Sequence, residues 1–199
     1  MMQYRQCDSE ASSSALRPEV EAIRHPFSRT GSPCQTRRVL SVRYATFSDA
    51  HRLARRLRDA DVREIEASTG ESSHQALEAG LRNAQPCYAL TDREDCPIAL
   101  FGVTPDHDSG RANAGVIWLM GAELPRGCQM DFLRRCRGWL EHLQANYDVL
   151  WNRIDARNAT HIRWLKWCGF KFDRLIAEHG VQRRAFWEFT RTRDAVHDS

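Results

Sequence analysis

Lysine is almost missing from this chain of 199 residues, in which only Lys166 and Lys171 occur among 29 basic side chains. The arginines that supply the rest can fork onto phosphates, a feature of nucleic-acid-binding proteins. However, 26 acidic side chains leave a net charge of only +3, and both signs are mixed along the chain. A dedicated nucleic-acid domain is usually one-sidedly basic. We therefore expect no nucleic-acid partner and attribute the arginine excess to an arginine-biased coding composition.

Long apolar runs and paired cysteine motifs are also missing. No stretch approaches the roughly 18 apolar residues that a membrane helix needs, and the first residues lack the apolar core of a secretory signal. The seven cysteines are scattered without a C-x-x-C pair, which argues against a disulfide framework and a zinc site. The Asp106–Asp108 cluster fits a polar turn better than a metal site. We expect a protein without a membrane span or a metal, kept in a cytosolic compartment.

Apolar residues make up 42% of the chain, enough for a folded core, but their patterns are unevenly distributed. Residues 1–38 contain a Ser-Ser-Ser run and three prolines without apolar periodicity, so we expect a flexible extension there. Residues 39–191 carry regular patterns and form the expected folded domain. Residues 192–199 form a polar tail.

Strand and helix patterns alternate through residues 39–191. The expected strands are 39–44, 87–91, 98–103, 114–121, 149–154, 172–177 and 185–190, and the expected helices are 49–58, 62–68, 73–83, 130–146 and 159–168. Asp49 is expected to cap the first helix, and the apolar strand 114–121 to be buried on both faces. Because a helix separates this strand from the next, residues 114–154 predict a β-α-β crossover with parallel strands. The fold class is therefore α/β, a mixed sheet flanked by helices.

The order of these elements and one motif resemble the GNAT superfamily of N-acetyltransferases. In that family an Asn follows a strand, a short helix comes next, and a Gly-Phe pair closes the helix eleven residues after the Asn. Asn158 and Gly169-Phe170 have this spacing, and Asn158 is suited to cap the helix that Gly169 ends. The segment Tyr44–Asp49 also looks like the family's first strand and helix start. The resemblance implies a GNAT-like fold and acetyl-CoA as the cofactor of an active member.

A closer resemblance is to the small internal virion proteins of short-tailed phages, which look like GNAT-fold proteins themselves. It rests on Asp61–Ala67, Ile117–Gly121 and Asn158–Phe170, where His161 and Leu165 differ from a generic acetyltransferase. The resemblance implies a role in particle assembly or genome delivery, with other virion proteins as partners. It also implies a location in the virion interior or the host cytoplasm.

The cofactor-binding loop of the GNAT family matches this chain poorly. The family has a Gln or Arg, then two residues, Gly, one residue, and Gly or Ala, so that backbone amides cradle a pyrophosphate. At these positions stand Leu124, Gly127 and Gln129, of which only Gly127 agrees. Arg126 is either a replacement phosphate ligand or an ordinary surface arginine. Asn158 either contacts the pantetheine arm or serves only as a helix cap.

Catalytic groups are equally sparse. The family's general acid, a Tyr four residues before the closing Gly, is replaced by Leu165, which has no proton to give. Glu123, just after the strand 114–121, is a candidate general base or a solvated carboxylate. We therefore favour a phage internal virion protein whose GNAT-like domain is catalytically degraded and needs no cofactor. The alternative is an acetyl-CoA-dependent N-acetyltransferase of unknown acceptor.

Overall fold

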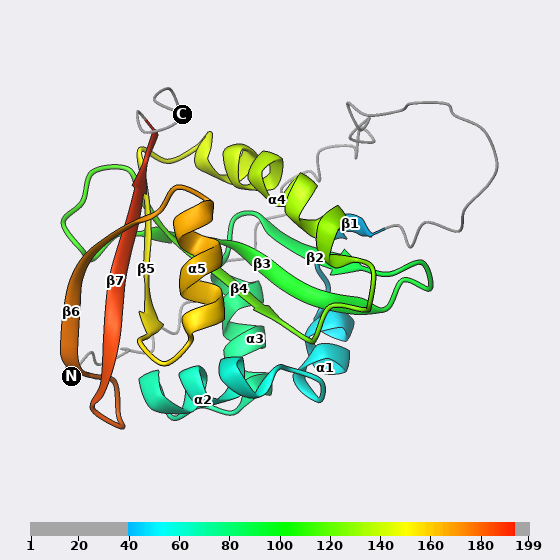
Figure 1. Ribbon diagram of the computed structural model, residues 1–199, viewed down its shortest axis with the longest axis horizontal. Coiled ribbons are helices and arrows are strands. Elements are labelled where there is room, and N and C mark those ends of the chain that lie inside the picture. Colours follow the sequence, from blue (N-terminus) through cyan, green and yellow to red (C-terminus); the bar gives the residue numbers. More distant parts are fainter. Residues whose placement is uncertain (1–39, 194–199) are drawn as a thin grey trace, which may run out of the picture. The chain divides into compact units, whose positions relative to one another are not determined.

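The computed structural model describes residues 40–193, which form a mixed sheet with helices around it (Figure 1). The expected flexible extension, residues 1–38, and the end of the polar tail, residues 194–199, lie outside the described residues. Thr192, expected in that tail, is the last residue of a strand, and the amide of Arg193 donates to the carbonyl of Asp148 over 3.0 Å.

The described residues contain the expected strands and helices in the expected order. The strands are β1 (Ser41–Tyr44), β2 (Cys87–Thr91), β3 (Pro97–Asp106), β4 (Ala114–Gly121), β5 (Val149–Asp155), β6 (Lys171–His179) and β7 (Arg184–Thr192). The helices are α1 (Phe47–Ala54), α2 (Asp59–Ser68), α3 (Ser73–Asn83), α4 (Gln129–Gln144) and α5 (Ala159–Trp167). The main differences from expectation are that α1 ends four residues early and α2 begins three residues early. Arg58 separates them, because its backbone is extended where a helix would need to continue.

The strands form one sheet in the order β1-β2-β3-β4-β5-β7-β6. β4 and β5 run parallel, joined through α4, which confirms the predicted β-α-β crossover. Every other neighbouring pair in the described sheet is antiparallel.

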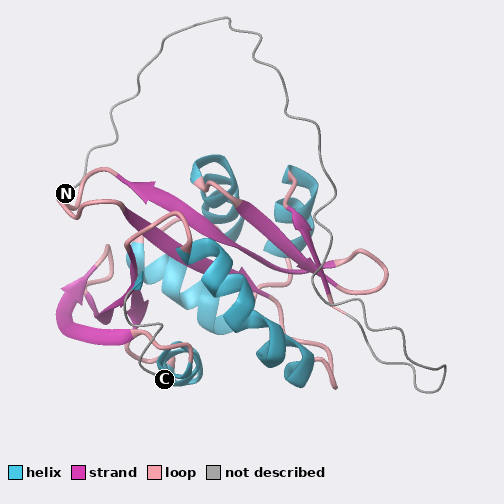
Figure 2. Cartoon of the chain, turned by 90° about the horizontal axis from the view of Figure 1, so that it is seen from above, coloured by secondary structure: helices cyan, strands magenta, loops and turns pink. Residues whose placement is uncertain are grey.

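Helices cover both sides of the sheet, as Figure 2 shows, and each side has its own core. One buried cluster joins strand residues such as Phe101 to Leu140 of α4 and Leu165 of α5. The other joins the next-door residue Leu100 to side chains of α1, α2 and α3, among them Leu77. Because neighbouring side chains of a strand point to opposite faces, Leu100 and Phe101 serve the two cores separately.

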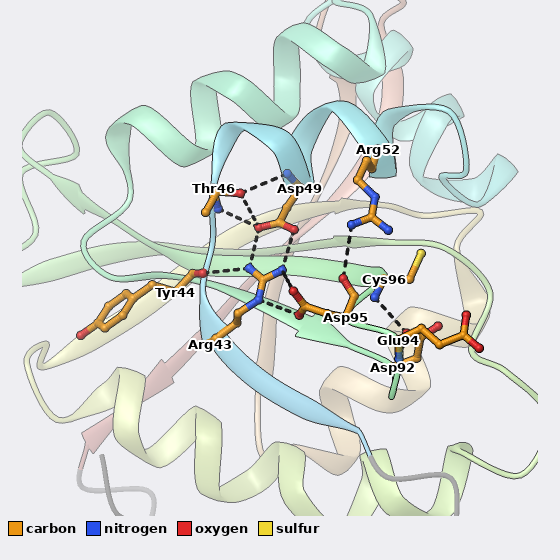
Figure 3. A network of polar contacts seen from close by, with 9 residues as sticks. All are labelled: Arg43, Tyr44, Thr46, Asp49, Arg52, Asp92, Glu94, Asp95 and Cys96. Carbon is orange, nitrogen blue, oxygen red and sulfur yellow. Dashed lines mark hydrogen bonds and ion pairs between the residues drawn. The ribbon is translucent and has the colours of Figure 1, made fainter. Parts of the chain in front are cut away.

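The start of α1 is held by a capping box, and Asp49 takes a different place in it from the predicted one. Thr46 is the N-cap, its hydroxyl accepts from the amide of Asp49 over 3.3 Å, and the Asp49 carboxylate accepts from the amide of Thr46 over 2.9 Å. Asp49 is thus the third helical residue. Figure 3 shows its carboxylate facing Arg43 of β1, with two contacts of 2.7 and 2.9 Å. Arg43 also pairs with Asp95 in the β2–β3 turn, so one guanidinium ties a strand, a helix and a turn together.

β4 is less buried than its apolar sequence predicts. Its ends are buried, but Val116 to Met120 are half-buried. The reason is that β5 accompanies β4 only over Ala114, Gly115 and Val116 and then leans away from it (Figure 1). Beyond that point one edge of β4 has no backbone partner from β5.

Candidate functional site

The two parallel strands separate after Val116, and side chains fill the place of the missing backbone ladder. The Asn152 side-chain amide of β5 donates to the carbonyl of Ile117 over 2.7 Å. In a continuous parallel ladder a backbone amide of β5 would donate a hydrogen bond to this carbonyl. Asn152 therefore satisfies the Ile117 carbonyl of β4 with its side chain. We call the region beyond Val116, where β4 and β5 separate, the splay, and Asn152 occupies its first part.

Helix α2 lies across the far end of the splay, and its first turn is bonded to the end of β4. The carboxylate of Asp61 accepts from the amide of Gly121 over 2.9 Å, and the amide of Arg58 donates to the Gly121 carbonyl over 2.9 Å. Asp61 is buried and forms an ion pair with Arg58 over 2.8 Å. Burial raises the pKa of the Asp61 carboxyl, and the negative charge of Glu123 adds to that rise.

One helical turn further on, α2 contacts the end of β5 through Glu64. Its carboxylate lies 3.4 Å from the amide of Asp155 and 3.4 Å from the side-chain amide of Asn158. Burial raises the pKa of Glu64 to about 7, and the charge of Asp61 acts in the same direction. Residues three apart lie on one face of a helix, so Asp61 and Glu64 together span the separated ends of β4 and β5.

His161 joins the same cluster from the first turn of α5. Its amide donates to the side chain of Asn158, which confirms Asn158 as the N-cap of α5. Burial lowers the pKa of the His161 ring to about 3, and the positive charge of Arg58 contributes. The ring is therefore neutral at physiological pH. The Glu64 carboxyl of the same cluster can gain or lose a proton there, as a general base must.

The predicted cofactor loop forms a tight turn before α4. Arg126 and Gly127 are exposed, and Gly127 has the positive φ of 84° that favours glycine. The amide of Gly127 donates to the side chain of Gln129 over 3.0 Å, so this amide is already bonded within the loop. Asp131 places a carboxylate in the first turn of α4, next to where a pyrophosphate would need positive potential.

Large aromatic side chains pack between α4 and α5. Phe132 of α4 and Trp164 of α5 have ring centroids 5.8 Å apart, and Trp139 lies 6.2 Å from Phe132. Leu165, which stands at the position of the family's catalytic tyrosine, is buried in the same core. The space between these two helices is therefore occupied by the protein's own side chains.

The predicted site residues fall into two groups. Asn158 belongs to the Glu64 cluster, and Glu123, which is exposed, lies close enough for its charge to act on Asp61. Arg126 and Gly127 belong to the turn before α4. Glu64 and Asn152 are not predicted from the sequence, because a single Glu on a helix or Asn in a strand carries no spacing signal of its own. The one available signal was the resemblance over Asp61–Ala67.

Two other kinds of site are absent from the residues that the structure describes. Among residues 40–193, no group of three or more His, Cys, Asp or Glu side chains could hold a metal ion. Within the same residues, no helix is long and apolar enough to cross a membrane.

Solved structures show which fold this is. The ribosomal-protein-alanine N-acetyltransferase of Brucella melitensis superposes with a TM-score of 0.58 at 19% identity, over 76% of this chain and 99% of that one. A GNAT-family acetyltransferase of Bacillus anthracis superposes with a TM-score of 0.57 at 11% identity, over 78% of this chain and 95% of that one. The spermidine N-acetyltransferase of Vibrio cholerae, solved with CoA and spermine, superposes with a TM-score of 0.56 at 13% identity, over 78% of this chain and 96% of that one. The chain has the GNAT fold, as predicted.

A family model narrows this class. Residues 112–178, about a third of the chain, match the phage family described as "Bacteriophage T7, probable scaffold protein Gp13". This segment runs from β4 through α4, β5 and α5 into β6, and it confirms the predicted resemblance to a phage protein family. No curated protein sequence matches the chain.

Proposed function

We propose that this chain is a phage virion protein whose GNAT-like domain has lost acetyl-CoA binding and acts through its surfaces in particle assembly or genome delivery. The observation that carries the proposal is the filled splay between β4 and β5, where Asn152 bonds the Ile117 carbonyl. A ligand arm that bound along this edge of β4 would have to displace that hydrogen bond. Displacement would leave a buried polar group in need of a new partner.

Three further features support the loss of cofactor binding. Gln129 occupies an amide of the loop that should cradle a pyrophosphate, and Asp131 adds a negative charge at the start of the same helix. Leu165 replaces the tyrosine that would protonate a leaving thiolate. Aromatic side chains pack between α4 and α5.

The match to a phage family described as a probable scaffold protein supports the assembly part of the proposal. Mass spectrometry of purified particles from the phage that carries this sequence tests it. The chain should be found in the particles at a fixed ratio to the capsid protein, and particles made without it should be defective in assembly or in infection. A chain confined to the infected-cell extract, with normal particles formed in its absence, would overturn the proposal.

One observation favours the alternative, an acetyl-CoA-dependent N-acetyltransferase. Glu64, with its pKa raised to about 7, stands at the end of the splay and can accept a proton at neutral pH.

Thiol release from acetyl-CoA with spermidine as acceptor tests this alternative, since a spermidine acetyltransferase shares the fold. The full chain is compared with Glu64→Gln and with Glu66→Gln, an exposed residue of the same helix. Turnover that Glu64→Gln abolishes and Glu66→Gln preserves would establish an enzyme. We expect no release above background from any of the three.

A further inference from the structure

Three arginines converge on one buried carboxylate, Glu188. Glu188 of β7 accepts from Arg111 over 3.0 Å, from Arg153 over 3.1 Å and from Arg174 over 3.2 Å. Arg153 and Arg174 are the Cα partners of Glu188 on the strands at its two sides, β5 and β6, and Arg111 comes from the β3–β4 loop. The cluster therefore lies on the sheet face opposite to that of Asn152.

The arginines are held in place by an aromatic ring as well as by the carboxylate. The guanidinium of Arg111 lies 4.3 Å from the ring centre of Trp151, and that of Arg153 lies 5.1 Å from it. The indole nitrogen of Trp151 donates to Asp106 over 2.6 Å, so the ring cannot rotate freely. Two of the three guanidinium groups are thus oriented before any ligand arrives.

The cluster keeps donors and positive charge for an outside partner. A guanidinium has five N–H donors, and contacts with one carboxylate use only part of them. The Glu188 side chain is 4% exposed, whereas Arg111 and Arg153 are about a third exposed and Arg174 is 63% exposed. The exposed atoms are therefore those of the cations. Lys171, the Cα partner of Thr190, adds a further exposed cation to the same face.

We infer that this Arg111–Arg153–Arg174 cluster binds the phosphate backbone of duplex DNA. Guanidinium forks match phosphate oxygens, and oriented arginines lose less conformational entropy on binding. Proteins that bind single strands stack bases on aromatic rings. The Trp151 ring cannot stack on a base in this way, because Arg111 and Arg153 already lie over it. Contact with the backbone alone predicts binding without sequence preference and with strong salt dependence.

The expectation of no nucleic-acid partner came from the whole-chain charge of +3, which averages over all faces. A net charge summed over the whole chain does not reveal that arginines gather at one place on the surface. Arg111, Arg153 and Arg174 are separated by 42 and 21 positions in the sequence. The pairing of β5, β7 and β6 brings Arg153 and Arg174 together, and the β3–β4 loop adds Arg111. The inference does not depend on the loss of acetyl-CoA binding.

Fluorescence anisotropy of a labelled duplex with the full chain, repeated over a series of salt concentrations, tests this inference. Arg174→Ala removes the most exposed member and should weaken binding several-fold and reduce the salt slope by about 0.9, the change for one lost phosphate contact. Arg174→Lys should keep the slope, since the charge remains. Arg183→Ala is the matched control, because Arg183 is exposed to a similar degree and pairs with Glu178 on the β6–β7 hairpin.

Circular dichroism confirms that each variant is folded before binding is measured. Absence of binding by the unaltered chain at low salt, or a salt-independent affinity, would overturn the inference. So would an equal loss in Arg174→Ala and Arg183→Ala, which would indicate unspecific charge attraction. Competition by polyglutamate as effective as that by unlabelled duplex would also overturn it, because the surface would then bind acidic polypeptides.

Discussion

Glu64 shows how a single side chain acquires chemistry from its surroundings. Its pKa rises from 4.5 in a free carboxyl to about 7, since the contacts with Asn158 and Asp155 do not compensate for burial. The folded state then binds the proton more tightly than the unfolded state. Glu64 therefore costs no stability below about pH 4.5, and the cost grows as the pH rises toward 7.

The substitution Glu64→Gln should accordingly stabilise the fold at about pH 8, by about 2 to 3 kcal/mol, and change little at about pH 4. Denaturant unfolding at the two pH values measures this. Glu66→Gln, on the exposed side of α2, should have little effect at either pH. A loss of stability in Glu64→Gln at high pH would mean that the carboxylate is stabilised by its contacts, contrary to the raised pKa.

The pKa of Asp49 is shifted in the opposite direction to that of Glu64. Burial alone would raise its pKa, but hydrogen bonds from Arg43 and Thr46 outweigh burial and lower the pKa of the Asp49 carboxyl below its usual value. Its contribution to stability is present above the ordinary pKa of an aspartate and is lost as the pH falls through the lowered value.

Asp49→Asn should destabilise the protein by about 2 to 4 kcal/mol at neutral pH, because it leaves Arg43 without its buried partner and weakens the capping box. Thermal unfolding measures the loss, which should shrink in acid. Asp95→Asn removes the exposed partner of the same arginine and should cost far less. Equal losses from the two substitutions would contradict the account of this network in Figure 3.

At the scale of elements, α2 is held between the two halves of the sheet. Its first turns contact the ends of β4 and β5, and its last residues, Ala67 and Ser68, accept from amides of the β6–β7 hairpin. Gly180 makes that last contact possible. Its φ is +68°, and a Cβ at this position would lie 2.3 Å from the carbonyl oxygen of Ala67.

Gly180→Ala should therefore destabilise the fold strongly, on the order of 3 kcal/mol or more. Gly110→Ala is the matched control, since Gly110 has a similar φ of +73° but open space around its Cα. Its cost should be only that of the left-handed backbone, about 1 kcal/mol. Unfolding free energies of the two variants give the comparison, and similar values would show that the hairpin moves away from α2 without penalty.

Most elements could be predicted from the sequence because their patterns are local. The strand 87–91 and the helix 73–83 have the bounds that alternation and helical spacing predict, and Asn158 and Gly169 bound α5 as their capping chemistry requires. The first two helices were less predictable. Thr46 and Asp49 can each cap a helix, and in the structure Thr46 is the N-cap while Asp49 completes the capping box and pairs with Arg43.

For the molecule as a whole, the order of the elements was enough to predict the fold class. It was not enough to predict the splay between β4 and β5 or the side chains of Asn152 and Glu64 that line it. The ladder between β4 and β5 ends at Val116, and no local sequence pattern encodes where it ends. Asn152 and Glu64 take their roles from contacts 35 and 94 residues away in sequence. The convergence of arginines on Glu188 is hidden for the same reason.

Residues 40–193 have a GNAT fold and include a segment that matches a phage family, and we propose that their own side chains fill the place where acetyl-CoA would bind. Calorimetric titration of the full chain with acetyl-CoA and with CoA tests this claim most directly. We predict no heat of binding at micromolar concentrations, and the same result for Arg126→Glu and for its control Arg134→Glu. Micromolar binding of acetyl-CoA that Arg126→Glu abolishes and Arg134→Glu retains would contradict the account.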